Sequence, residues 1–154
     1  SGGQFDDNMF DCIAALKVPY ILSHTKGTPD TMQQFAQYNC IIDDLIKYFS
    51  ERLNQLRLMG VKDIWLDPGF GFAKTVEQNH ELLDRLDELT TLFKEPFLAG
   101  ISRKSMIYKK LNITPEQSLN GTTALNTKAL LRGARILRVH DVQEAKELVS
   151  LEIV

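Results

Sequence analysis

Short apolar runs recur along the chain, and sequence with a helical period separates each run from the next. The runs lie at residues 18–22, 64–66, 97–101 and 136–139. Runs of this length between amphipathic helices are typical of the strands of a parallel sheet. The pattern therefore predicts an α/β fold of four βα units, preceded by a helix over about residues 7–16.

The helix after the first run has the clearest apolar face. Thr28 before Pro29 predicts where it begins, because a capping side chain followed by proline favours a first turn. Gly60 predicts its end. Its apolar residues are spaced by three and four positions, at Met32, Phe35, Ile42, Leu45, Ile46, Phe49, Leu53 and Leu56.

The same signals predict further helices over about residues 76–92, 102–111, 122–131 and 142–151. Thr114 and Gln117 have the spacing of a capping box, which predicts another helical start. Gly133 should end the helix over residues 122–131. The helix over residues 76–92 should bury one stripe of side chains, Leu82, Leu83, Leu86 and Leu89.

Four βα units are half of a (β/α)8 TIM barrel, which typically needs about 250 residues. The competing architecture is a four-stranded doubly wound sheet, which usually has a glycine-rich phosphate turn between a strand and a helix. Neither G-x-G-x-x-G nor G-x-x-x-x-G-K-[ST] occurs in the sequence. We therefore expect a half barrel, although such a fragment leaves two apolar strand edges unpaired.

Composition restricts the classes of function. The formal net charge of −2 gives no basic footprint for nucleic acid. The apolar runs are too short to span a membrane, and the opening residues do not resemble a signal peptide. Cys12 and Cys40 are too few and too far apart for a disulfide framework, which indicates reduced, buried thiols in a cytoplasmic protein. The sequence has no starting Met and opens in a predicted loop, so we expect it to begin partway through a larger fold.

The stretch IWLDPGFGFAK, at residues 64–74, is the strongest candidate for a binding site. A strand that ends at Asp67 presents a carboxylate at its C-terminal end, where ligands bind in parallel α/β proteins. Gly69 and Gly71 let the loop backbone approach a ligand closely. Phe72 then stands on a loop. The alternative is that Asp67 only caps the turn and the loop phenylalanines join the core.

Polar residues also follow the first and third apolar runs. His24 could be a ligand or a base, and the alternative is a structural hydrogen-bonding role. After the third run, Ser102, Arg103 and Lys104 place two cations beside hydroxyl groups at a strand-to-helix junction.

The end of the fourth run carries a pair of groups suited to an anion. Alternation along a strand turns Arg138 and His140 to the same side. This arrangement predicts an anion site, and barrels often bind phosphate at that position. The alternative is that Arg138 pairs with Asp141 on a solvated rim.

Four motifs, DPGFGFAK, GISRKSMI, NGTTALN and RVHDV, closely resemble dihydropteroate synthase of folate biosynthesis in their order and separations. The resemblance extends from Ser1 almost to the C-terminus, and the opening SGG is similar to the loop after that family's fourth barrel strand. It implies that residues 1–154 are the C-terminal half of a single pterin-binding TIM-barrel domain, with the N-terminal half absent.

The family condenses 6-hydroxymethyl-7,8-dihydropterin diphosphate with 4-aminobenzoate, which gives 7,8-dihydropteroate and pyrophosphate. Sulfonamides mimic the aminobenzoate. The resemblance implies that the substrates are bound by seven side chains of this sequence, Asp67, Phe72, Ser102, Arg103, Lys104, Arg138 and His140.

Each of these residues takes a role from the matching position of the family. Asp67 would accept two parallel hydrogen bonds from the pterin, and Lys104 would donate to the opposite edge of the ring. Arg138 and His140 match the diphosphate-binding pair, and with Lys104 they form the implied catalytic set. Phe72 would pack on the aminobenzoate ring.

Ser102 and Arg103 would lie near the aminobenzoate carboxylate. The resemblance also implies a Mg2+ shared with the diphosphate, whose protein ligand would lie in the absent N-terminal half. It further implies a homodimer formed through the later helices. We expect no nucleic acid or membrane as a partner.

Two departures qualify the resemblance. Ser23 stands where the family often has a Met that packs on the pterin, so hydrophobic cover should be thinner there. Other elements of the family's site precede this segment, so we expect the fragment alone to be inactive.

The alternative function is the pterin- or folate-binding domain of corrinoid methyltransferases, and a third possibility is an interaction module. The SRKS segment and Phe72 favour the synthase.

Overall fold

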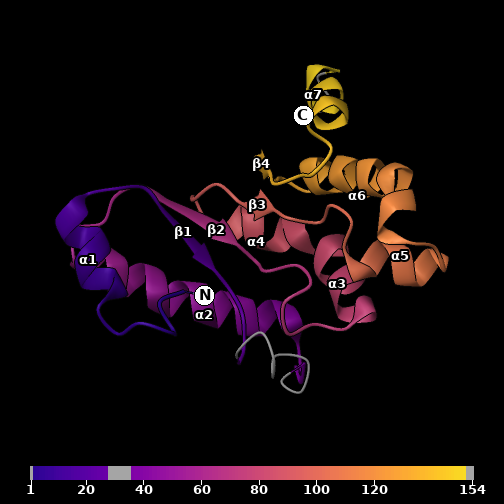
Figure 1. Cartoon of the computed structure of the whole chain (residues 1–154). Coiled ribbons are helices and arrows are strands. Elements are labelled where there is room, and N and C mark those ends of the chain that lie inside the picture. The colour runs from indigo at the N-terminus through magenta and orange to yellow at the C-terminus, as the bar shows by residue number, and fades with distance from the viewer. Residues whose placement is uncertain (1, 28–35, 152–154) are drawn as a thin grey trace.

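The computed structural model describes residues 2–27 and 36–151 (Figure 1). It contains four short strands, each followed in the chain by helix, as the apolar runs predicted. The strands are β1 (Tyr20–Ser23), β2 (Ile64–Asp67), β3 (Leu98–Ala99) and β4 (Ile136–Leu137).

All strand pairing in the described residues is parallel. β1 pairs with β2 along its full length, from Tyr20 opposite Ile64 to Ser23 opposite Asp67. β3 pairs with β4, and an isolated parallel bridge between Leu66 and Phe97 joins the two pairs. The strands therefore follow one another in sequence order across the molecule (Figure 1). This order differs from a doubly wound sheet, in which the strand order reverses at the binding crevice.

Helices connect and flank these strands. In Figure 1, α2 runs alongside the β1–β2 pair, and α7 stands at the opposite end of the molecule from α1. The helices are α1 (Met9–Leu16), α2 (Ile41–Leu58), α3 (Val76–Asp84), α4 (Leu86–Leu92), α5 (Ser105–Leu111), α6 (Leu119–Leu131) and α7 (Val142–Ser150), with a 3-10 turn η2 at Pro115–Gln117.

The core lies between the strands and the predicted apolar faces of the helices. Phe49 of α2 packs edge-to-face against Phe93 and Phe97, with ring centroids 5.9 and 5.8 Å away. Burial of each such large apolar side chain stabilises the fold by about 1.5–3 kcal/mol. The predicted stripes are confirmed except at Ile46, which is only partly buried. The following residues are each at most 1% exposed: Ile42, Leu45, Phe49, Leu53, Leu56, Leu82, Leu83, Leu86 and Leu89.

The predicted N-terminal part of the long helix is wrong over residues 36–40, which are not helical. α2 begins at Ile41, where Asp43 and Asp44 complement the positive end of the helix dipole. The proposed start at Thr28 and Pro29, and the apolar positions Met32 and Phe35, lie outside the described residues.

The helix expected over residues 76–92 is broken in two at Arg85. Arg85 forms ion pairs with Glu81 on α3 and with Glu88 on α4. The predicted capping box is confirmed at η2, where Thr114 and Gln117 bond to each other's backbone.

The helix expected from residue 102 begins three residues later, at Ser105. Arg103 has a φ of 54°, in the left-handed region, and Lys104 is extended. Neither conformation can continue a right-handed helix. The residues between β3 and α5 therefore form a turn rather than a first helical turn.

Two expectations from composition can be compared with the structure. Cys12 and Cys40 are both free, but the prediction that they are buried is wrong, because Cys12 is exposed and Cys40 is partly exposed. Within the described residues, no helix combines the length and the apolar character needed to cross a membrane.

Candidate functional site

Asp67 is the last residue of β2, and its carboxylate is buried at the C-terminal end of the strand. The Ser23 hydroxyl, at the end of the neighbouring β1, donates to Oδ2 over 3.2 Å. The backbone N–H of Gly69 donates to Oδ1 over 2.8 Å. Asp67 therefore caps the turn, as the alternative interpretation of this residue predicted. Each carboxylate oxygen still keeps a lone pair for a further donor.

The loop after Asp67 adopts the shape that its glycines predict. Gly69 and Gly71 have φ values of 73° and 81°. Gly69 also lies against the His24 carbonyl, since a Cβ atom there would be 1.9 Å from the oxygen. Phe70 is buried in the core, whereas Phe72 is 36% exposed. Only one of the two loop phenylalanines therefore joins the core.

Lys104 brings the third strand end to this loop. Its ammonium lies 4.2 Å from the centroid of the Phe72 ring and donates to the Phe70 carbonyl oxygen. Burial lowers the pKa of Lys104 to about 8, the negative charge of Asp67 opposes this shift, and the charge of Arg138 adds to it. Lys104 is thus electrostatically coupled both to the carboxylate after β2 and to the cation after β4.

The two cations after β3 and β4 have different partners. The Arg103 guanidinium pairs with both oxygens of Asp141, which holds the pKa of the Asp141 carboxyl below its usual range. The alternative in which Arg138 pairs with Asp141 is therefore wrong. The Arg138 guanidinium lies against Gly100, where a Cβ atom would be 3.0 Å from Nη2.

Ser102 and His140 join the ends of β3 and β4. The His140 backbone N–H donates to Ser102 Oγ over 3.2 Å, and the same hydroxyl lies 3.0 Å from His140 Nδ1. The hydroxyl hydrogen is free to point at Nδ1, which fixes the orientation of the imidazole ring. Ser102 is buried, and His140 is exposed at the surface of the loop.

Two buried groups in this region were not predicted to work together. Lys74, only 2% exposed, lies 3.1 Å from His24 Nδ1, and its ammonium donates to the carbonyl oxygens of Gly69 and Phe72. Burial, with the charges of Lys74 and Lys26, lowers the pKa of His24 to about 2. His24 is therefore neutral and hydrogen-bonded, which favours the structural interpretation of this residue.

Sequence reasoning assigned no role to Lys74. The available signal was its place at the end of the DPGFGFAK motif, directly after the loop that it contacts. Asn79 was missed as well. It is fully buried, accepts from the Gly71 N–H over 2.7 Å and donates to the Thr75 carbonyl over 2.6 Å.

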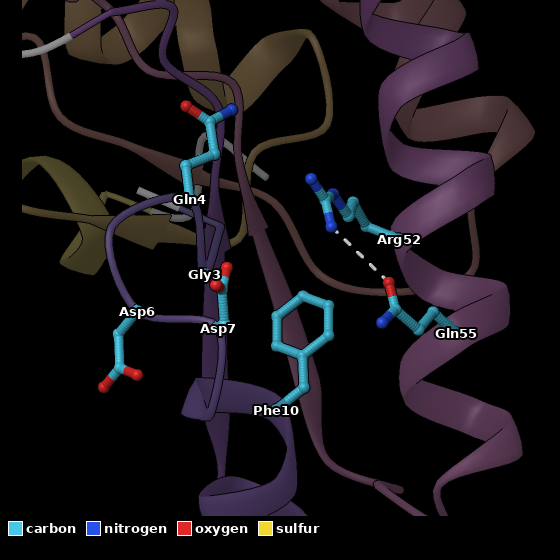
Figure 2. Close-up of a pocket in the computed structure, with 7 residues that line it drawn as sticks. All are labelled: Gly3, Gln4, Asp6, Asp7, Phe10, Arg52 and Gln55. Carbon is cyan, nitrogen blue, oxygen red and sulfur yellow. Dashed lines mark hydrogen bonds between the residues drawn. The ribbon is translucent and has the colours of Figure 1, made fainter.

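A separate cavity of about 280 Å3 lies between the N-terminal loop and α2 (Figure 2). Figure 2 shows Arg52 and Gln55 reaching from α2 toward the Phe10 ring, whereas the Asp6 carboxylate points away from them. The cavity is lined by Gly3, Gln4, Asp6, Asp7, Phe10, Arg52 and Gln55. None of the predicted site residues borders it.

Residues 1–140 match the family described as pterin binding enzyme. The chain belongs to this family. The predicted resemblance to dihydropteroate synthase is also confirmed by curated relatives. The dihydropteroate synthase of Escherichia coli (strain K12) is 40% identical over 143 residues, which cover 92% of this chain and 50% of the relative.

Solved dihydropteroate synthases that resemble this chain indicate a TIM-barrel-type fold. The Thermus thermophilus enzyme in complex with 4-aminobenzoate has a TM-score of 0.91 and 33% identity, and the match covers 100% of this chain and 63% of that one. A Yersinia pestis enzyme with a sulfonamide drug complex has a TM-score of 0.88 and 36% identity, with 92% and 52% covered. The chain thus spans about half the length of the relatives it matches.

The described residues of this chain do not suit a metal ion. They contain no cluster of three or more His, Cys, Asp or Glu side chains that could hold one. Asp67 faces hydrogen-bond donors, its charge acts on Lys74 and Lys104, and Asp141 is paired with Arg103. Both carboxylates of the candidate site, which are the kind of ligand that Mg2+ prefers, therefore already have hydrogen-bond or ion-pair partners.

Proposed function

We propose that this chain is the C-terminal half of a dihydropteroate synthase barrel. The activity is the condensation of 6-hydroxymethyl-7,8-dihydropterin diphosphate with 4-aminobenzoate, which yields 7,8-dihydropteroate and pyrophosphate. The observation that carries the proposal is the position of Lys104 against the loop after Asp67, where its ammonium donates to the Phe70 carbonyl oxygen and lies 4.2 Å from the centroid of the Phe72 ring. The charges of Asp67 and Arg138 both act on this ammonium. One pocket then combines a carboxylate for a flat heterocycle with cations for its departing anion.

The half-barrel assignment covers residues 1–154 as one domain whose N-terminal half lies outside this sequence. Four parallel strands in sequence order support it, as does the half-length match to the Escherichia coli relative. In a complete barrel, the outer edges of β1 and β4 pair with strands of the N-terminal half. The fragment alone is inactive under this proposal.

Asp67 and Lys104 hold the pterin from opposite edges. The ring's N3–H and 2-amino group form a flat donor pair, and the two carboxylate oxygens of Asp67 accept from it in parallel. Ser23 and Gly69 already donate to these oxygens, so the carboxylate has a fixed orientation. The Lys104 ammonium donates to the carbonyl and ring nitrogen on the other edge.

The catalytic contribution of this half is stabilisation of the leaving anion. Lys104, Arg138 and His140 present positive or hydrogen-bonding groups where charge accumulates as the C–O bond breaks. The arylamine then attacks the electron-poor methylene of the pterin. Because an arylamine is already a nucleophile, the reaction needs no strong general base.

Phe72, Ser102 and Arg103 form the aminobenzoate side of the pocket. The exposed face of the Phe72 ring packs on the aminobenzoate ring, and Arg103 offers its remaining N–H groups to the carboxylate while Asp141 holds it. The Thermus thermophilus structure in complex with 4-aminobenzoate supports this substrate. The Yersinia pestis structure with a sulfonamide drug complex supports sulfonamides as ligands of the complete enzyme.

Three further features belong to the proposal. Mg2+ accompanies the diphosphate, and its protein ligand lies in the N-terminal half. The complete enzyme is a homodimer. The free cysteines support a cytoplasmic location.

A complete barrel tests the function. This chain is joined behind the N-terminal half of the Escherichia coli relative, and pyrophosphate release is measured with the pterin diphosphate. The expected result is release that depends on 4-aminobenzoate, with no release from either half alone. Pterin binding without release would instead indicate a carrier domain, as in corrinoid methyltransferases. Release that does not depend on aminobenzoate would refute the synthase.

A further inference from the structure

The Lys74 ammonium is surrounded by three acceptors from two separate loops. It donates to the carbonyl oxygens of Gly69 and Phe72, each 3.1 Å away, on the loop after β2. His24 Nδ1, also 3.1 Å away, belongs to the segment after β1. An ammonium carries three N–H donors, so the number of donors equals the number of acceptors.

The protonation state of His24 is consistent with this arrangement. Burial and the neighbouring lysine charges lower the pKa of His24 to about 2, so its ring is neutral at physiological pH. With Lys74 donating to Nδ1, the ring proton of His24 resides on Nε2. Loss of the ammonium would take away the donor that the described residues give to His24 Nδ1 and to the Phe72 carbonyl oxygen, whereas the Gly69 carbonyl oxygen would keep the Phe72 N–H. An acceptor without a donor is costly in a buried site.

Both loops held by Lys74 also contact Asp67. The His24 N–H donates to the Asp67 carbonyl over 2.9 Å, and the Gly69 N–H donates to the Asp67 side chain. Lys74 therefore fixes the backbone on both sides of the carboxylate. Asn79 holds the next part of the same loop through the Gly71 N–H.

We propose that Lys74 is a positioning residue for the pterin, which fixes the loop that orients the Asp67 carboxylate and carries the Phe72 ring. This role rests on the proposed function, because it assigns a purpose to the loop around Asp67. Lys74 itself does not touch the substrate. Its ammonium is used entirely by the protein.

The charges around Lys74 agree with a structural use of its ammonium. Burial lowers the pKa of Lys74 to about 7, Asp67 opposes the shift, and Lys104 and Lys26 add to it. The groups that face it are thus one carboxylate, two lysines and the neutral ring of His24. Burial of a charged ammonium costs free energy unless the group is hydrogen-bonded, and the hydrogen bonds of Lys74 offset this cost.

Amide hydrogen exchange of the 154-residue chain tests the proposal without a ligand. The Gly69 amide reports on Asp67 directly, because it donates to the carboxylate, and the Leu66 amide is a sheet reference that donates to Pro96. Lys74→Met should speed exchange of the Gly69 amide at least about tenfold while leaving the Leu66 amide unchanged. Lys74→Gln retains two donors and should lie between wild type and Lys74→Met.

A matched control is Lys128→Met, which removes an exposed lysine paired with Asp84 on the helices. This variant should leave both amides unchanged. Unchanged Gly69 protection in either folded Lys74 variant would overturn the proposal. If neither variant folds, the wild-type chain still decides, because a Gly69 amide that exchanges as fast as an exposed amide means that Asp67 is not held.

Pterin binding to the complete barrel separates positioning from general destabilisation. Positioning predicts that Lys74→Met raises the Kd for the pterin at least about tenfold while one molecule still binds per protein. A merely structural role would lower the fraction that binds and leave the Kd of the remainder unchanged. If wild type binds no pterin, the proposed function fails, and the Gly69 amide still reports whether Lys74 fixes the loop.

Discussion

The Ser23 hydroxyl donates to the Asp67 carboxylate across the β1–β2 pair, with 3.2 Å between Oγ and Oδ2. The two residues are direct partners in the parallel register. A serine at this position therefore does more than thin the hydrophobic cover expected there, because it gives Oδ2 a donor while the Gly69 N–H serves Oδ1. The carboxylate is oriented before any ligand arrives.

Replacing Asp67 by asparagine should remove most pterin affinity from the complete barrel. The asparagine oxygen would remain with the Gly69 N–H, which turns the amide NH2 toward the pterin's own donors. An unpaired buried donor costs about 1–3 kcal/mol, so the Kd should rise by roughly ten- to a hundredfold. Titration calorimetry with the free pterin measures this directly.

The control for this change is Asp63→Asn, which alters an exposed acid just before the start of the same strand. It should leave the affinity unchanged. An Asp67→Asn barrel that keeps its Kd within about threefold, or roughly 0.7 kcal/mol, would show that Asp67 does not receive the pterin donors.

Arg138→Ala should weaken binding of the pterin diphosphate while sparing the free pterin. The Arg138 charge acts on Lys104, at the place assigned to the anion, and it is exposed enough to be screened by salt. The loss should therefore shrink as ionic strength rises. Affinities of both ligands at low and high salt provide the measurement.

Arg135→Ala is the matched change, since it removes the same charge from an exposed residue just before β4. It should affect neither ligand. Equal losses for the diphosphate and the free pterin in Arg138→Ala would assign Arg138 to the scaffold instead.

Periodicity was sufficient to predict the strands and the buried faces of the helices. Leu82 and Leu89, for example, are buried where spacing alone placed them. Helix starts were harder to predict, because local backbone conformation determines them. The left-handed φ of Arg103 delays α5 to Ser105, and no pattern of apolar residues records that turn.

In the candidate site, single residues could be predicted from the sequence, whereas contacts between distant residues could not. Motif residues such as Asp67 and Lys104 were predicted and lie close enough to be electrostatically coupled. The pairs that hold the site together were not predicted. Lys74 meets His24 from 50 positions away, and Arg103 meets Asp141 across 38. Such pairs depend on the folded register of two loops, which spacing within one segment does not specify.

Gly69 provides a test of how closely the two loops approach. Gly69→Ala should destabilise the chain more than Gly60→Ala. Both glycines have a positive φ, but a Cβ atom at Gly60 meets nothing within 4 Å, whereas at Gly69 it lies 1.9 Å from the His24 carbonyl oxygen. Gly60→Ala should cost about 1–2 kcal/mol from the left-handed backbone alone.

Gly69→Ala should cost a further 1–3 kcal/mol or so, because the clash forces the backbone of two loops apart. Denaturant unfolding of the two variants and the wild type gives the three free energies. Equal losses for the two variants would mean that the loops after β1 and β2 are farther apart than the structure shows.

The buried pair of His24 and Lys74 should make stability depend on pH. The folded pKa of His24 is about 2, below its ordinary 6.5, so the unfolded chain binds an extra proton between these values. The free energy of unfolding should therefore fall as the pH drops below 6.5, by about 1.4 kcal/mol per pH unit from this group. Lys74, lowered from 10.5 to about 7, has the same sign, and stability should rise with pH above 7.

Comparison with His24→Gln isolates the histidine, because the glutamine oxygen can still accept from Lys74 but does not titrate. Denaturant unfolding as the pH is lowered from 6 to 4, about two units, should show the wild type losing stability relative to this variant by up to about 2.7 kcal/mol. Other acids contribute equally to both proteins and cancel in the difference. If the two stability curves run parallel over this range, His24 is already protonated in the folded protein, and it cannot be the acceptor that Lys74 requires.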